Sequence, residues 1–196
     1  MWTYFVKGGF LMWPLLGFSI FSVAIIIERL LFFYRVTRVD TRFVEKVRLL
    51  VRDNNTAGAL RLCDKYRSPV TAILKKGIIE YRDGNEIMQK AMEQAGIYEI
   101  PKLEKYLPIL AAIASIATLV GFTGTVLGMI RAFNSIAASG VSSPTVVAKG
   151  ISEALITTAT GLLIAAPTLL FYYYFSHRAD RIMTQIEQVT KEMSNL

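Results

Sequence analysis

Threonine hydroxyls recur at helical spacing inside two long uncharged stretches of the chain. Thr118 and Thr125 belong to one series of small residues three or four positions apart, and Thr158 and Thr168 belong to another. Residues at this spacing share one face of a helix, and small faces let two helices approach closely. Hydroxyls on two such faces would line a polar seam that coordinates or relays an ion. The series are Ala111, Ala114, Thr118, Gly121, Thr125, Gly128 and Ala132, and Ala154, Thr158, Gly161, Ala165 and Thr168.

A carboxylate, Glu153, lies at the start of the second stretch. A charged carboxyl group at the centre of a bilayer costs about 3 kcal/mol or more, so such a group usually faces protein or water. Glu153 is therefore a candidate for the mouth of an ion path. The structural alternative is an ion pair with Lys149, one helical turn earlier. In the same way, the threonines could bond their own helix backbone and the small faces, with the spaced pair Gly124 and Gly128, could serve packing alone.

Neither stretch contains Asp, Lys, Arg or His deep within it. Threonine hydroxyls bind or relay ions, but they do not titrate near neutral pH. If ions cross here, we expect the deep titrating group to come from another chain, which makes this protein one part of an ion path that needs a partner helix.

The elements that carry these residues are predicted to be transmembrane helices. The 196 residues include 37 charged ones, and all of them lie outside 8–27, 106–130 and 154–176, while the mean hydropathy is +0.42. Runs of 20 or more uncharged residues cross a bilayer as helices, which satisfy their own backbone hydrogen bonds. The first run leads straight into Glu28 and Arg29 without a cleavage site, which predicts a retained helix.

The distribution of Lys and Arg predicts the orientation. Sixteen of the 22 basic residues lie within 29–105 and three follow the third span, whereas Lys7, Arg131 and Lys149 lie on the other side. Because cytoplasmic segments are rich in Lys and Arg, we expect a cytoplasmic middle segment and C-terminus and an outward N-terminus. The net charge of +7 reflects this pattern, and a nucleic-acid partner is not expected.

Composition argues against an enzyme. The chain has one cysteine, Cys63, and one histidine, His177, and it lacks a phosphate-binding loop sequence. No metal site, cofactor or catalytic residue is predicted. Cys63 stands among apolar residues, which favours a buried, inert thiol.

The segment 35–105 is predicted to be helical. Asp40 or Thr41 can begin one helix, Thr56 a second, and Ser68-Pro69 a third. Asn85 can cap a fourth, which Pro101 and Pro108 would bend or interrupt before the second span.

Two sequence blocks resemble the ExbB/TolQ/MotA proton-channel family. The block 121–133, Gly-Phe-Thr-Gly-Thr-Val-Leu-Gly-Met-Ile-Arg-Ala-Phe, is similar to the second-helix signature of that family. The block 150–162, Gly-Ile-Ser-Glu-Ala-Leu-Ile-Thr-Thr-Ala-Thr-Gly-Leu, is similar to its third-helix signature, as are Ala166-Pro167 and Tyr172 after it. The resemblance is closest to the ExbB/TolQ branch, because the MotA branch has an additional transmembrane helix.

The resemblance implies an all-α integral membrane protein whose three transmembrane helices extend into a helical cytoplasmic region. It implies a homopentamer around two helices of an ExbD- or TolR-like partner, whose Asp carries the ion. The expected work is coupling of the proton motive force, in the bacterial inner membrane, to a TonB- or TolA-like transducer. The expected segments are 1–34 and 106–133 (first and second spans), 35–105 (cytoplasmic), 134–149 (periplasmic loop), 150–176 (third span) and 177–196 (cytoplasmic helix).

The resemblance also assigns residues to the ion path. Its pore threonines fall on Thr125 and Thr158 and its pore glutamate on Glu153. Thr157 lies one turn from Glu153 on the same helix face, while Thr158 lies about 140° round the helix from Glu153. The sequence therefore leaves open which of the two threonines faces the ion path. The family match favours Thr158. Position 118 is Thr in this chain, where the family often has Pro. This extra hydroxyl leaves open whether the path carries protons or sodium ions. The small residues expected to line the path or pack helices are Gly121, Gly124, Gly128, Ala154, Gly161 and Ala165.

Other functions remain open at this point. The same ion chemistry would suit a stator of a gliding or other surface-motility motor. A different class is a passive membrane scaffold in which the small faces only pack helices. An intramembrane enzyme fits least, because His177 stands alone at the edge of the third span.

Overall fold

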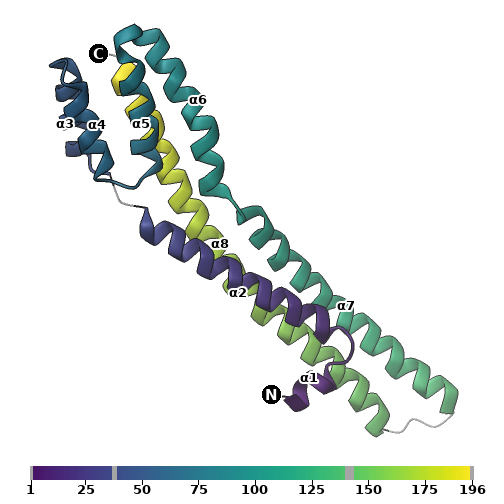
Figure 1. Ribbon diagram of the computed structural model, residues 1–196. Helices are drawn as coiled ribbons and strands as arrows, with labels where there is room; N and C mark the ends of the chain where they lie inside the picture. Colours follow the sequence, from purple (N-terminus) through teal and green to yellow (C-terminus); the bar gives the residue numbers. More distant parts are fainter. Residues whose placement is uncertain (1, 37–38, 140–143, 195–196) are drawn as a thin grey trace. The chain divides into compact units, whose positions relative to one another are not determined.

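The described residues, 2–36, 39–139 and 144–194, are helical and contain no strand in this computed structural model (Figure 1). Helices α2 (Met12–Arg35), α7 (Leu107–Ser139) and α8 (Pro144–Ser194) each contain a stretch long and apolar enough to cross a membrane. The three predicted spans are therefore confirmed as helices of sufficient length. The short α1 (Trp2–Lys7) precedes them, and Gly9 turns the chain into α2 with a φ of +72°.

The chain divides into two units. The first comprises Met1–Glu28 and Tyr106–Tyr174, and the second comprises Arg29–Lys105 and Phe175–Leu196. In the first unit α2, α7 and the first part of α8 lie side by side (Figure 1). Their common core includes Met12, Leu15, Ala117 and Ala165, with apolar side chains such as Phe18 packed around it.

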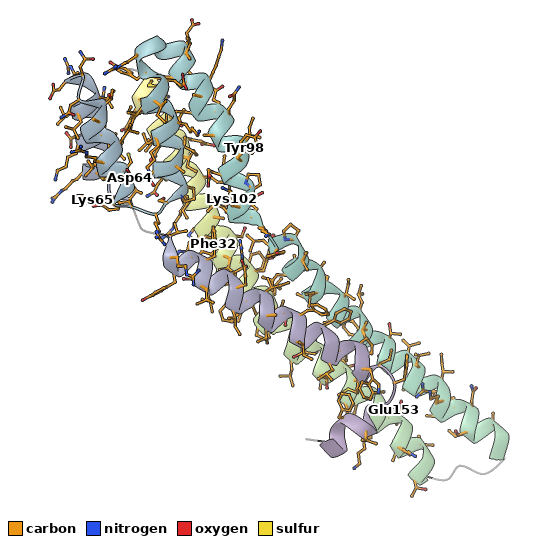
Figure 2. All side chains as sticks on the ribbon, viewed as in Figure 1. Phe32, Asp64, Lys65, Tyr98, Lys102 and Glu153 are labelled. Atoms are coloured by element: carbon orange, nitrogen blue, oxygen red, sulfur yellow. The ribbon has the colours of Figure 1, made fainter. Side chains whose placement is uncertain are left out.

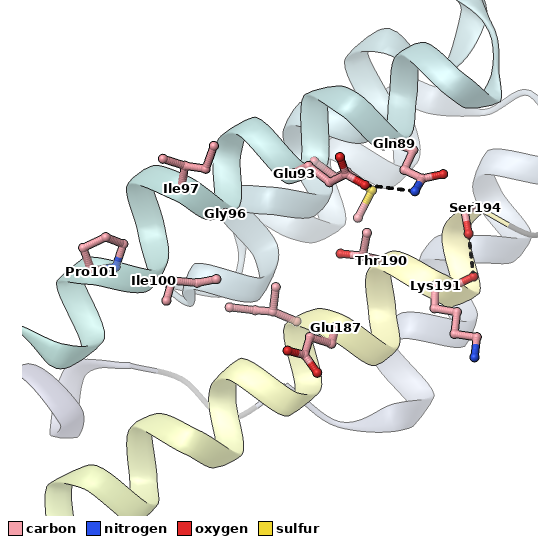
Figure 3. Close-up of a pocket in the computed structure, with 12 residues that line it drawn as sticks. Gln89, Glu93, Gly96, Ile97, Ile100, Pro101, Glu187, Thr190, Lys191 and Ser194 are labelled. Atoms are coloured by element: carbon pink, nitrogen blue, oxygen red, sulfur yellow. Dashed lines mark hydrogen bonds between the residues drawn. The ribbon is translucent and has the colours of Figure 1, made fainter.

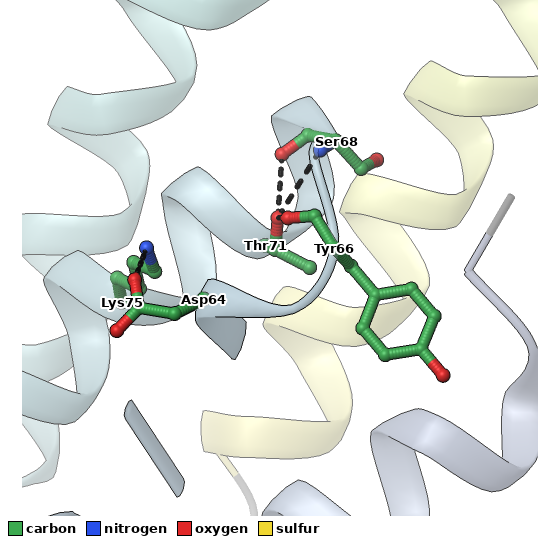
Figure 4. Close-up of polar contacts among 5 residues, drawn as sticks. All are labelled: Asp64, Tyr66, Ser68, Thr71 and Lys75. Atoms are coloured by element: carbon green, nitrogen blue, oxygen red, sulfur yellow. Dashed lines mark hydrogen bonds and ion pairs between the residues drawn. The ribbon is translucent and has the colours of Figure 1, made fainter. Parts of the chain in front are cut away.

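The second unit contains α3 (Thr41–Arg52), α4 (Thr56–Asp64), α5 (Pro69–Glu80), the 3-10 turn η1 (Tyr81–Asp83) and α6 (Asn85–Glu104), with the end of α8. The predicted starts at Asp40 or Thr41, at Thr56 and at Ser68-Pro69 are confirmed, and Thr41 is the first residue of α3. Asn55 caps α4, accepting a hydrogen bond from the Gly58 N–H at 2.9 Å. Ser68 caps α5: it exchanges hydrogen bonds with Thr71 (Figure 4), and its hydroxyl accepts one from the Val70 N–H.

One local expectation was wrong: Asn85 is the first residue of α6, and the cap before it is Gly84, whose φ of +115° suits glycine. The expected interruption before the second span is confirmed. It falls between the two prolines, because Pro101 lies inside α6 and the helix ends before Lys105 and Tyr106, where Tyr106 has a φ of +67°. Pro108 then occupies the first turn of α7, where a missing N–H costs little.

The loop expected over 134–149 is mostly helix. Helix α7 continues to Ser139 and α8 begins at Pro144, so the connection is short, and 140–143 lie outside the described residues. Helix α8 has 51 residues, more than twice what a bilayer requires. This length agrees with the expectation that a membrane helix continues beyond its span.

A buried arginine side chain, that of Arg29, binds the end of α6 in the second unit. Arg29 is 1% exposed, donates from Nη1 to the Lys102 carbonyl at 3.0 Å, and lies 4.6 Å from the centre of the Phe32 ring. Lys102 is within the last turn of α6, where carbonyls lack helical partners. Arg29 therefore closes the end of α6, which the sequence did not predict, because nothing local distinguishes it from an interfacial arginine.

Candidate functional site: the seam between α7 and α8

The small residues of α7 and α8 bring the two backbones into contact. A Cβ atom built on Gly161 would lie 2.6 Å from the Ala117 carbonyl oxygen, and one on Gly128 would lie 2.9 Å from the Gly150 carbonyl oxygen. Since real Cβ atoms do not approach backbone so closely, only glycine fits at these positions. The predicted small faces do meet, and they form a tight seam.

Most members of the two predicted series are buried in the seam, but three of their threonines are not. On α7 the buried residues are Ala114, Gly121, Gly128 and Ala132 of the series together with Ala117 and Gly124, while Thr118 and Thr125 are half-buried. On α8 the buried members are Ala154, Thr157, Gly161, Ala165 and Thr168. Because Thr118, Thr125 and Thr158 are only half-buried, their hydroxyls stand at the edges of the seam.

Thr157 is packed inside the first unit. It is 1% exposed, and its Oγ1 lies 3.1 Å from the Gly8 carbonyl and 2.8 Å from the Glu153 carbonyl, both of which accept from it. A Cβ on Gly124 would lie 2.6 Å from the Thr157 Cβ. Thr157 thus ties α8 to α7 and to the turn before α2.

Thr158 has a different environment. It is half-buried, and its Oγ1 donates to the Gly121 carbonyl of α7 at 2.7 Å. Thr125, one turn after Gly121, donates to its own helix at the Phe122 carbonyl at 2.6 Å. A hydroxyl that donates keeps its lone pairs for accepting. Thr125 and Thr158 therefore present acceptor oxygens within about one turn of each other along the seam.

Three further threonines bond the backbone of their own helix, which is the alternative to a role in an ion path. Thr118, Thr160 and Thr168 each donate to the carbonyl four residues earlier, at 3.0, 2.8 and 2.7 Å. Such bonds satisfy a threonine in a membrane helix without any ligand. Of these three, Thr118 was predicted for the ion path, and the hydrogen bond described for its hydroxyl is to its own helix.

Glu153 lies on α8 beside the turn that joins α1 and α2 (Figure 2). Its carboxylate forms an ion pair with Arg131 of α7, so the partner is not the expected Lys149. The Glu153 side chain is 22% exposed, and a Cβ on Gly9 would lie 3.0 Å from its carboxyl carbon. Spacing along one helix favoured Lys149, whereas the close contact of α7 and α8 brings Arg131 to Glu153.

Arg131, Gly8 and Gly9 were not among the predicted site residues. Arg131 entered the sequence prediction only through the charge distribution and the block 121–133, and its partner lies 22 residues away on the next helix. The consecutive glycines 8 and 9 were a visible signal of a tight turn. Their contact with α8 is a tertiary property that no local spacing reveals.

A groove in the second unit lies between α6 and the end of α8 (Figure 3) and has a volume of about 550 Å³. Its lining is mainly apolar, with Met92, Ile97 and Ile186, and carries Glu93 and Glu187. No group of three or more metal-binding side chains occurs among the described residues. The groove is a surface on which helices can pack. The residues predicted for the ion path lie in the first unit.

Comparison with known proteins gives the following similarities. The profile of the MotA/TolQ/ExbB proton channel family matches residues 65–188. A putative biopolymer transport protein ExbB-like 3 from Synechocystis sp. is 31% identical over 96% of this chain and 90% of its own length. The biopolymer transport protein exbB1 of Vibrio cholerae is 30% identical over 91% of this chain and 80% of its own. The Tol-Pal system protein TolQ of Haemophilus influenzae is 40% identical over 47% of this chain and 41% of its own.

Proposed function

Because the chain belongs to the MotA/TolQ/ExbB proton channel family, we propose that it is the multi-span subunit of an ion-driven motor in the bacterial inner membrane. In this proposal five copies surround two single-span helices of an ExbD- or TolR-like partner. The partner's Asp takes up and releases the ion, which is a proton. The stored energy is about 2.3 kcal/mol per charge per 100 mV, and it is delivered through a TonB- or TolA-like transducer.

The observation that carries this proposal is the edge of the α7–α8 seam. Thr125 and Thr158 offer hydroxyl oxygens there, and neither is fully buried. No Asp, Lys, Arg or His lies along the described seam between them, so the path needs a titrating group from a second protein. Thr158 ranks ahead of Thr157, since Thr157 is enclosed by Gly8 and Gly124.

The predicted topology supplies the direction of coupling. The N-terminus and the connection between α7 and α8 face the periplasm, where Glu153 marks the entrance of the path. The segment 35–105 and the C-terminal part of α8 are cytoplasmic. Support comes from the asymmetry of Lys and Arg, of which 16 lie in 29–105.

Three single substitutions test the assignment. In the complex with its partner, Thr125→Ala, Thr158→Ala and Glu153→Ala should each lose proton-driven work in a complementation assay while the complex still assembles. Thr160→Ala is the matched control, since Thr160 bonds only its own helix in the described contacts. Full activity of all three test variants would refute the ion path and leave the passive scaffold.

A further inference from the structure

Arg131 and Glu153 face each other where α7 and α8 are in backbone contact. Close to both, a Cβ on Gly150 would lie 3.0 Å from the Gly128 carbonyl oxygen and 2.9 Å from the Ala132 Cβ. Such an approach leaves no room for a side chain between the helices. The guanidinium of Arg131 therefore reaches the Glu153 carboxylate directly.

The carboxylate is also fixed from the other side. Gly9, with its φ of +72°, lies against Glu153, and the neighbouring Gly8 carbonyl accepts from Thr157 one turn along α8. The Glu153 side chain is 22% exposed, whereas that of Arg131 is 56% exposed. Glu153 is thus held between a cation from α7 and the backbone of the glycine turn.

We propose that Arg131 is a specificity-determining residue, which makes this end of the ion path accept protons and reject Na⁺. The inference rests on the proposed function, because it assigns ion choice to the entrance of that path. An arginine keeps its charge at all working pH values. Its presence neutralises the Glu153 carboxylate and repels a second cation at the same oxygens.

The two ions differ in what they need at this position. Na⁺ must bring its charge to the site and exchange water for oxygen ligands, which requires the carboxylate to be free of its guanidinium partner. A proton moves between hydroxyl or water oxygens along hydrogen bonds, so it passes without displacing Arg131. Arg131 acts through Glu153 and is in this sense a positioning residue.

The test compares proton uptake and ²²Na⁺ uptake by proteoliposomes that contain the chain with its co-purified single-span partner. Arg131→Gln should raise ²²Na⁺ uptake at least about tenfold over the natural protein, because a free carboxylate attracts cations. Arg131→Lys, which keeps the charge, should retain proton selection. The double variant Arg131→Gln with Glu153→Gln should lose the gained ²²Na⁺ uptake.

Lys149→Gln is the matched control, because it removes a cation from α8 near Glu153 but keeps the Arg131 ion pair. It should leave ²²Na⁺ uptake unchanged. If Arg131→Gln does not yield a folded complex, Arg131→Met, which keeps the apolar stem, carries the same expectation.

The outcomes separate the two proposals. Absence of any partner, or of flux of either ion in the natural complex, would overturn the proposed function. Proton flux in the natural complex, together with ²²Na⁺ uptake that is equal in the natural complex and in Arg131→Gln, would overturn this inference alone.

Discussion

At the scale of single residues, two adjacent threonines of α8 have different surroundings. Thr157 is enclosed and bonds Gly8, whereas Thr158 stands at the edge of the seam and bonds Gly121. Thr157→Val should therefore destabilise the protein by about 1–2 kcal/mol through the lost hydrogen bonds, with ion-driven work retained in the protein that folds. Thr158→Val should abolish ion-driven work, and Thr158→Ser should restore it.

Thermal unfolding together with a complementation assay checks this pair of expectations. A Thr157→Val protein that is stable but inactive, with an active Thr158→Val protein, would reverse the two roles.

Cys63 on α4 is fully buried, and burial raises the pKa of its thiol from 9.0 to about 11, with Lys75 acting in the opposite direction. Because the folded-state pKa exceeds the unfolded value, the thiol stabilises the fold below pH 9, and this contribution is lost as the pH rises towards 11. Relative to Cys63→Ala, the natural protein should lose up to about 2 kcal/mol across this range.

Denaturant unfolding of both proteins at pH 8, 9, 10 and 11 measures the difference. The variant is the control for the lysines and tyrosines that titrate in the same range. A difference independent of pH would contradict the role of the thiol.

At the scale of elements, the seam depends on glycines that admit no side chain. A Cβ on Gly161 would meet the Ala117 carbonyl oxygen at 2.6 Å and the Gly121 Cα at 3.0 Å. Gly161→Ala should push α7 and α8 apart and cost about 1–3 kcal/mol. Gly17→Ala on α2 is the matched control, because nothing lies within 4 Å of its built Cβ, and it should be neutral or slightly stabilising.

Thermal unfolding in one detergent compares the two alanine variants with the natural protein. Equal melting temperatures for Gly161→Ala and Gly17→Ala would mean that the helices are not in backbone contact.

The start of α5 shows how a short motif fixes an element of the second unit. Ser68 accepts from the Val70 N–H at 3.3 Å, and Thr71 Oγ1 lies 2.9 Å from the Tyr66 carbonyl and 2.8 Å from the Ser68 carbonyl (Figure 4). Ser68→Ala should cost about 1 kcal/mol. Ser68→Asp, which keeps a capping oxygen, should cost less.

Hydrogen exchange of the first α5 amides in the full chain reports this loss of capping directly. Faster exchange in Ser68→Ala but not in Ser68→Asp is the expected pattern, and equal protection in both would contradict the cap.

At the scale of the whole molecule, Glu153 stands at one end of the seam, and no Asp, Lys, Arg or His lies deep within the three uncharged stretches of the chain. If the proposed architecture holds, native mass spectrometry of the co-expressed pair should show five copies of this chain with two of the single-span partner. Thr160→Ala should leave that stoichiometry unchanged. A stable monomer that binds no partner would rule out the proposed architecture.

The sequence by itself determined which helices are long and apolar enough to cross a membrane, where most helices of the second unit begin, and which two blocks form the seam. These are local properties, since hydropathy, capping residues and helical spacing act over a few turns. The tertiary structure decided which hydroxyls stand inside the seam and which at its edge, because a rotation of one residue, about 100°, moves a side chain between these places. It also paired Glu153 with Arg131 and placed Gly8 and Gly9 against α8. Those contacts join residues far apart in the chain, and only the close packing of α7, α8 and the glycine turn brings them together.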